Sequence, residues 1–173
     1  AGDGWRLVSI PARFRSLGEK RNACAALASP DVDGFLVADD EDIYLPHWFQ
    51  ATADALSQAE WSRPGLVLLE DGVGLREVES EGLYHGGWAF RNYAFYRVRG
   101  YGPHNNGEDQ ELAGRLHEAG VTIHDPCEHH EPFYIYRYDN SSYHLSYMDD
   151  AGYRSLGDGE VTKTQVQPGW FRD

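Results

Sequence analysis

Short apolar runs alternate along this chain with segments of helical periodicity, and that order restricts the folds open to it. Residues 35–38 and residues 65–69 are unbroken apolar runs, as is typical of strands buried on both faces of a sheet. Apolar side chains at helical spacing predict three helices: over residues 17–29, after Pro46, and from Gly107 to Gly120. Strands that alternate with helices predict an α/β domain with a mostly parallel sheet flanked by helices.

Local signals indicate where these elements begin and end. Ser16 and Glu19 have the spacing of a capping box at the start of the first helix, and Gly120 is placed to end the last one. Residues 70–82 are rich in glycine and charge, so we expect a loop or an exposed hairpin there. Further strands are expected over residues 6–10, 121–123 and 133–138.

The chain has 173 residues and a formal net charge of −13. This length suits one domain, which we expect over residues 1–150, followed by a polar C-terminal tail over residues 151–173. The acidic excess disfavours nonspecific nucleic-acid binding, which requires clustered Lys and Arg. The sequence shows no apolar run that would span a membrane and no signal-peptide pattern, and its two cysteines, Cys24 and Cys127, form no disulfide framework. These features predict a reduced, cytoplasmic protein.

Four consecutive carboxylates, Asp39, Asp40, Glu41 and Asp42, follow the apolar run at residues 35–38. Their mutual repulsion raises their pKa values unless a cation lies among them. Open α/β sheets place ligands at the carboxyl ends of strands, and Mg²⁺ or Mn²⁺ prefers carboxylate oxygens. A solvated acidic turn that complements the dipole of the following helix is an equally good interpretation of the cluster alone.

A second acidic pair, Glu108-Asp109, lies in the first turn of the last predicted helix, where carboxylates commonly complement the helix dipole. Lys20 and Arg21 lie near the start of the first predicted helix, where the dipole disfavours cations. This placement is consistent with an anion facing them, or with a solvent-facing pair.

Four motifs in order carry a resemblance to a known family. They are GEKRN at residues 18–22, FLVADDEDIYLP at residues 35–46, GGWAFR at residues 86–91 and GEDQEL at residues 107–112, followed by Arg115-Leu116. In order and spacing, residues 6–147 resemble a glycosyltransferase of family 2. The resemblance implies the GT-A fold, a nucleotide-diphosphate sugar as donor and Mn²⁺ or Mg²⁺ as cofactor.

The resemblance also implies roles for the acidic residues. The family's Asp-x-Asp metal motif matches Asp39-Asp40-Glu41, with Glu in place of the second Asp, while Asp40-Glu41-Asp42 is the competing register. Implied metal ligands are Glu41, Asp42 and a late histidine, His144, for which a strand-end surface position is the alternative. The family's Glu-Asp motif matches Glu108-Asp109, which implies that Asp109 is the catalytic base. The residues implied to surround the nucleotide sugar are Lys20, Arg21, Asp39, Asp40, Gly86, Gly87 and Trp88.

Transfer would then proceed by one inverting displacement, in which an acceptor hydroxyl attacks the anomeric carbon of the sugar. The acceptor itself is not indicated by the sequence. The family begins with a strand, a helix and a second strand, whereas here residues 18–22 closely follow the first predicted strand. We therefore expect this GT-A-like domain to be N-terminally incomplete, with a sheet edge that a missing N-terminal segment or a partner chain covers.

Other functions remain open on the same residues. A non-catalytic module that binds a saccharide or a partner is the main alternative, and a metal-dependent phosphohydrolase is a third. Four potential zinc ligands occur close together: His124, Cys127, His129 and His130. Their spacing matches no closed zinc module, so it favours a polar turn over a zinc site.

Overall fold

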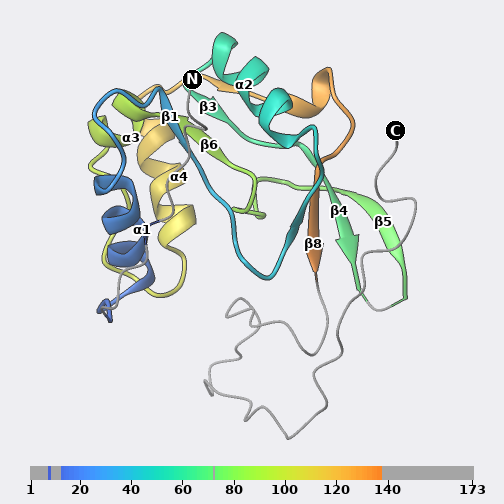
Figure 1. Ribbon diagram of the computed structural model, residues 1–173, viewed down its shortest axis with the longest axis horizontal. Coiled ribbons are helices and arrows are strands. Elements are labelled where there is room, and N and C mark those ends of the chain that lie inside the picture. The colour runs from blue at the N-terminus through green and yellow to red at the C-terminus, as the bar shows by residue number, and fades with distance from the viewer. Residues whose placement is uncertain (1–7, 9–12, 72, 138–173) are drawn as a thin grey trace, which may run out of the picture.

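The computed structural model describes residue 8 and residues 13–71 and 73–137. His144 and the tail predicted over residues 151–173 lie outside the described residues, as does nearly all of the strand predicted over residues 6–10. The described chain folds into two four-stranded sheets with four α-helices, shown in Figure 1.

The first sheet contains short strands from four separate parts of the chain. In order across the sheet they are β1 (Gly34–Leu36), β6 (Ala89–Arg91), β3 (Trp61–Ser62) and β7 (Ile123–His124). β6 runs antiparallel to both of its neighbours, with Phe90 opposite Phe35 in β1 and Trp61 in β3. Only β3 and β7 are parallel.

The second sheet follows the same mixed pattern. Its strands, in order, are β2 (Ile43–Tyr44), β8 (Tyr134–Arg137), β4 (Leu66–Glu70) and β5 (Leu75–Glu79). β4 and β8 are parallel, whereas the outer strands β2 and β5 run antiparallel to their neighbours. Within residues 70–82, where a loop or an exposed hairpin was expected, the exposed strand β5 forms a hairpin with the preceding β4.

The predicted GT-A-like, mostly parallel sheet flanked by helices is therefore wrong. Four of the six strand pairings in the described residues are antiparallel. β5 follows β4 through a hairpin and therefore runs back along it. β6 comes from a distant part of the chain and pairs with β1 in the opposite direction, just after a turn at Gly87 with φ of 82°. β1 is also not buried on both faces, because Leu36 is exposed.

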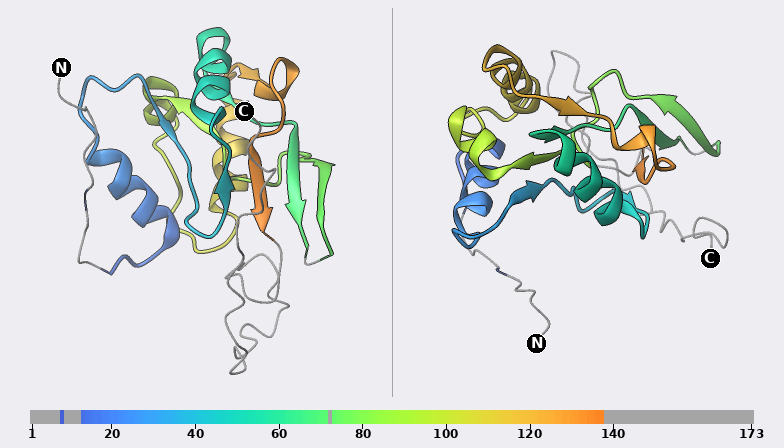
Figure 2. Two further views of the ribbon diagram at one scale, coloured as in Figure 1. Left: turned by 45° about the vertical axis from the view of Figure 1, so that its right-hand side comes forward. Right: turned by 90° about the horizontal axis from the view of Figure 1, so that it is seen from above.

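Four helices pack against these sheets: α1 (Leu17–Ala26), α2 (Trp48–Gln58), α3 (Asn92–Arg97) and α4 (Glu108–Glu118). Figures 1 and 2 show α1, α3 and α4 together on one side of the first sheet, with the second sheet on the other side. One core lies between the first sheet and these three helices, around Trp61, Trp88 and Phe90. A second core joins α2 to the second sheet through Trp48 and Phe133.

The local predictions are confirmed with small shifts in their ends. Ser16 Oγ accepts a hydrogen bond from the Glu19 N–H at 3.1 Å, although the Glu19 carboxylate accepts from Arg15 instead of closing the box on Ser16. α1 ends at Ala26, three residues earlier than expected. Gly120 follows α4 with a φ of 66°, the left-handed conformation that favours glycine after a helix.

Among the described residues, no helix combines the length and the apolarity that crossing a bilayer requires.

Candidate functional site

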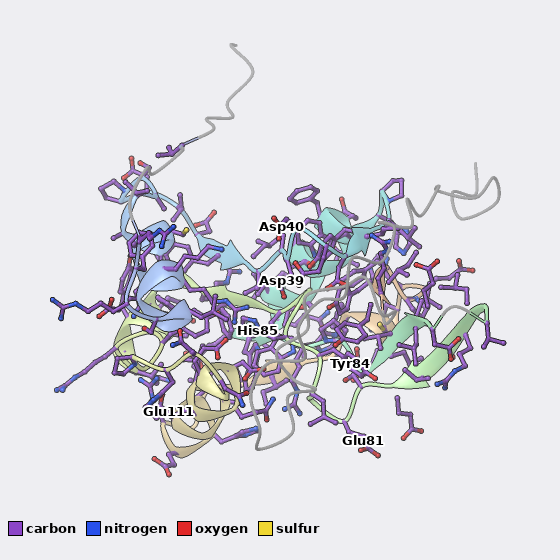
Figure 3. The ribbon with its side chains drawn as sticks, turned by 90° about the horizontal axis from the view of Figure 1, so that it is seen from below. Asp39, Asp40, Glu81, Tyr84, His85 and Glu111 are labelled. Carbon is purple, nitrogen blue, oxygen red and sulfur yellow. The ribbon has the colours of Figure 1, made fainter. Side chains whose placement is uncertain are left out.

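A cleft of about 720 Å³ lies between the segment after β1, the start of α4, and residues of β4 and β8 in the second sheet. Its walls come from the start of α1, the segment after β1, the loop before β6 and the loop that leads into α4. Figure 3 looks onto this face and shows Asp39, Asp40, His85 and Tyr84, all of which line the cleft, near the middle of the view. Segments far apart in the sequence therefore share one cavity.

The cleft brings together most of the residues that the sequence singled out. The predicted residues that line it are Lys20, Arg21, Asp39, Asp40, Glu41, Gly86, Glu108 and Asp109. Asp42, Gly87 and Trp88 do not line it, and Trp88 is fully buried in the first core.

Arg21 links the two acidic motifs across the cleft. Its guanidinium donates to Glu108 Oε1 at 2.7 Å and to Asp39 Oδ1 at 3.2 Å. The same guanidinium lies over the Tyr101 ring, 5.5 Å from the ring centroid. The Glu108 side chain is only 5% exposed, so this pair is largely removed from water. Arg21 thus fixes the start of α4 relative to the segment after β1.

Among the carboxylates after β1, Glu41 has a perturbed pKa. The pKa of Glu41 is raised, first by desolvation and then by its hydrogen bond to Asp40 and the charges of Asp39 and Asp42. Repulsion of this kind is relieved when a cation binds among the carboxylates. The raised pKa of Glu41 therefore reflects its partial burial first and the neighbouring acids second.

Asp42 has a different environment from the three acids before it. Its carboxylate accepts from the Tyr134 hydroxyl at 2.6 Å and from the Arg137 backbone N–H at 3.0 Å. Tyr134 in turn stacks on Tyr44, with 5.3 Å between the ring centroids. Asp42 therefore joins β2 to β8 within the second sheet.

The two acids at the start of α4 have different environments. Glu108 is buried against Arg21, and desolvation is the main cause of its raised pKa. Asp109 is half-buried, lines the cleft and accepts a hydrogen bond from the Gln110 N–H at 2.8 Å. Both acids line the cleft, but Arg21 pairs with Glu108 and not with Asp109.

His85 is a cleft residue that sequence reasoning missed. It is 6% exposed, and its Nε2 lies 2.8 Å from the Tyr101 hydroxyl. Desolvation, assisted by the charge of Arg21, lowers the pKa of His85 well below 6.5, so the imidazole is neutral. Its buried Nδ1 has no hydrogen-bond partner among the described residues. The sequence feature that could have indicated His85 is its position directly before the glycine pair Gly86-Gly87.

Both positions of the glycine pair Gly86-Gly87 require glycine. A Cβ on Gly86 would lie 2.5 Å from the Tyr134 hydroxyl oxygen, and Gly87 adopts a φ of 82°. The Gly87 N–H donates to the Val37 carbonyl at 3.1 Å, and the Val37 N–H donates to the Trp88 carbonyl at 2.9 Å. The pair therefore brings the backbone before β6 against the acidic segment after β1.

Comparison with known proteins assigns no family or function to this site, because no protein-family model and no curated protein matches the chain.

The chemistry of the cleft is set by its charges. Of the described side chains that line it, six are carboxylates and three are cationic, so a phosphate-bearing ligand would meet net repulsion on entering alone. A hard divalent cation held by carboxylate oxygens would reverse that balance. The donor set at Asp39, Asp40 and Glu41 fits Mg²⁺ or Mn²⁺, both of which prefer oxygen ligands.

Proposed function

We propose that this chain is a metal-dependent glycosyltransferase that moves a sugar from a nucleotide-diphosphate donor to an acceptor hydroxyl with inversion. The observation that carries the proposal is the cleft, which gathers the acids after β1, the basic residues of α1 and the acids that begin α4. These are three of the four motifs by which the sequence resembles family 2 glycosyltransferases. The proposal rests on the cleft and the motifs, and the sheet topology is not part of its support.

The acids after β1 would hold the metal ion. Asp39 and Glu41 both line the cleft, whereas Asp42 is engaged by Tyr134 and Arg137, which favours the register Asp39-Asp40-Glu41. When bound, a divalent cation neutralises the charge that develops on the leaving diphosphate. Lys20, exposed at the rim of the cleft, adds a cationic side chain that can approach the same phosphates.

Asp109 is the group proposed to act as the general base. Its carboxylate takes the proton from the acceptor hydroxyl while that oxygen bonds to the anomeric carbon. The bond from the anomeric carbon to the diphosphate breaks in the same step, and its electron pair leaves with the nucleoside diphosphate. Attack opposite to the leaving group inverts the anomeric configuration.

Glu108 and Arg21 support this base without taking part in proton transfer. Their 2.7 Å ion pair anchors the first turn of α4, and Arg21 also contacts Asp39. The distance between the base and the metal-binding acids is thereby constrained through one guanidinium. A general base contributes most when its position is set in advance, and this linkage supplies that constraint.

Nucleotide binding is the first test of the proposal. UDP and GDP are titrated into the chain by calorimetry, with MnCl₂ present or with a chelator in its place. We expect one of the two nucleotides to bind in the presence of Mn²⁺ and to lose most of its affinity in chelator, since the cleft alone repels phosphate. Glu41→Gln should weaken that metal-dependent binding. Absence of metal-dependent binding of either nucleotide would overturn the proposal.

Transfer is tested with Asp109→Asn and a matched control. Release of UDP or GDP is followed from a panel of nucleotide sugars with simple alkyl glycosides as acceptors. Asp109→Asn should lower turnover by roughly 10²–10⁴-fold, the contribution typical of a general base, while nucleotide affinity persists. Glu111→Gln is the control, because Glu111 is in the same helical turn but pairs with Arg115 and does not line the cleft. Near wild-type turnover of Asp109→Asn would remove Asp109 from this role.

A further inference from the structure

A second group of potential metal ligands lies away from the cleft. One ligand atom from each of His124, Glu128 and His129 lies within 4.8 Å of the other two. His124 ends β7, Glu128 ends a short 3₁₀ turn, η1 (Pro126–Glu128), and His129 follows it. In Figure 1 this connection, in orange before β8, lies beside α2, at the opposite end of the molecule from the tips of β4 and β8.

The backbone that carries these side chains is held from both sheets. Asp125 Oδ1 accepts from the N–H groups of Cys127 and Gly65, each at 2.8 Å, and Gly65 directly precedes β4. The Arg63 N–H, next to β3, donates to the His124 carbonyl at 3.1 Å. Pro126, within η1, is fully buried. The three ligand side chains therefore project from a connection that is braced before any ion binds.

The membership of the group differs from the four residues that the sequence suggested. Cys127 turns its thiol to the Leu66 carbonyl at 3.6 Å, and His130 pairs with Asp54 at 2.9 Å. Glu128, which the sequence reasoning did not single out, replaces them beside the two histidines. The potential ligands that lie close together are thus two imidazoles and one carboxylate.

Two imidazole nitrogens and one carboxylate oxygen form a donor set that suits Zn²⁺. Zinc held at about 2.1 Å by tetrahedral ligands requires those ligand atoms to be about 3.4 Å apart. Glu128 and His129 are exposed, so rotation of their side chains can close the present separation without moving the backbone. Three protein ligands leave the fourth position to water. The donor set differs from the cleft, whose carboxylates suit Mg²⁺ or Mn²⁺ instead.

We propose that His124, Glu128 and His129 bind one Zn²⁺ ion, and that this ion fastens the connection between the two sheets. β7 belongs to the first sheet and β8, which follows the connection, belongs to the second. An ion that binds only the folded chain stabilises it by mass action, so zinc raises the temperature of unfolding. The proposal is independent of sugar transfer, because none of the three ligands lines the cleft.

The experiment titrates ZnCl₂ into the whole chain against a chromophoric zinc chelator and records thermal unfolding in parallel. We expect one zinc site, and its affinity should fall at least about tenfold in His124→Gln and in His129→Gln. In known metal sites, changing a residue that only supports a ligand already lowers metal affinity by about that factor. The rise in unfolding temperature should shrink in the same two variants.

Two control variants make the result specific to this group. His130→Gln changes the neighbouring imidazole, which pairs with Asp54, and Glu41→Gln changes the cleft, so both should keep wild-type zinc affinity. The proposal is overturned if zinc does not bind the wild-type chain, if His124→Gln and His129→Gln bind as the wild type does, or if Glu41→Gln alone loses the site. Failure of sugar transfer would leave this test unaffected.

Discussion

At the scale of single residues, the cleft concentrates charges that are costly to hold close together. Glu41 has a raised pKa because it is partly desolvated and faces Asp40, Asp39 and Asp42. Glu108 is compensated by Arg21, which also reaches Asp39. The acids of the cleft therefore have two kinds of environment: Glu108 lies beside Arg21, and Glu41 lies among other carboxylates.

The pH dependence of stability should reveal this strain at Glu41. A carboxyl whose pKa is higher in the folded state than its ordinary 4.5 favours folding when protonated, so that contribution is lost as the pH rises through the folded pKa. Glutamine does not ionise, so the Glu41→Gln variant does not lose this stability as the pH rises. The free energy of unfolding, measured with urea, should therefore favour the variant over the wild type more strongly near pH 7 than below pH 4.5.

Metal addition and a control sharpen the same measurement. MgCl₂ near neutral pH should raise the free energy of unfolding of the wild type more than that of Glu41→Gln, because the variant has lost a ligand. Glu79→Gln changes an exposed glutamate on β5, outside the cleft, and should reproduce the wild-type pH and MgCl₂ responses. An identical pH profile for wild type and Glu41→Gln would contradict the raised pKa.

At the scale of elements, α1 is positioned by close backbone contacts. The Gly18 N–H donates to the His104 carbonyl at 3.2 Å, and the Leu17 N–H donates to Asn105 Oδ1 at 3.0 Å. A Cβ on Gly18 would lie 1.8 Å from the Gly102 carbonyl oxygen. The absence of a side chain at Gly18 thus allows α1 to bring Lys20 and Arg21 to the cleft.

Two helical glycines should respond in opposite directions to the same substitution. Gly18→Ala forces α1 away from the loop at Gly102 and should lower the free energy of unfolding by roughly 1–3 kcal/mol. Gly114→Ala, in α4, places its Cβ in open space and should raise the free energy by about 0.5–1 kcal/mol through helix propensity. Urea unfolding of both variants measures the two changes. Equal effects of the two substitutions would show that the close approach at Gly18 is not required.

At the scale of the whole molecule, two cores under two mixed sheets support a strongly acidic surface. The first core lies beneath α1, α3 and α4, and the second lies beneath α2. The formal net charge of −13 is spread over 173 residues, so the folded chain carries substantial self-repulsion at low ionic strength.

Salt should stabilise the molecule as a whole. Sodium chloride at about 0.15 M shortens the screening length to about 8 Å and weakens repulsion between distant carboxylates. Relative to low salt at neutral pH, we expect the unfolding temperature to rise by roughly 2–4 °C, the shift that about 1 kcal/mol produces at this size. Near the isoelectric point of about 4.9 the same salt should have little effect. A salt effect of equal size at both pH values would contradict an origin in net charge.

Part of the candidate site was predictable because its signals are local. The capping hydroxyl of Ser16, the glycine that ends α4 and the acidic run at residues 39–42 act on neighbours within one turn of chain. The sequence could also place Lys20, Glu41 and Asp109 in one predicted site through motif order, and all three line the cleft. The partners that determine each side chain's environment come from distant segments, and these were not predictable.

What the sequence determined by itself was therefore the location of three of the four described helices, α1, α2 and α4, and of the residues with charge to contribute, whereas α3 was not predicted. The tertiary structure decided strand direction, because the antiparallel pairing of β6 with β1 depends on a turn at Gly87 and on contacts with Val37. It also decided that Trp88 packs in the core while His85 lies in the cleft. Periodicity and capping are properties of consecutive residues, whereas strand pairing and burial depend on which distant segments meet.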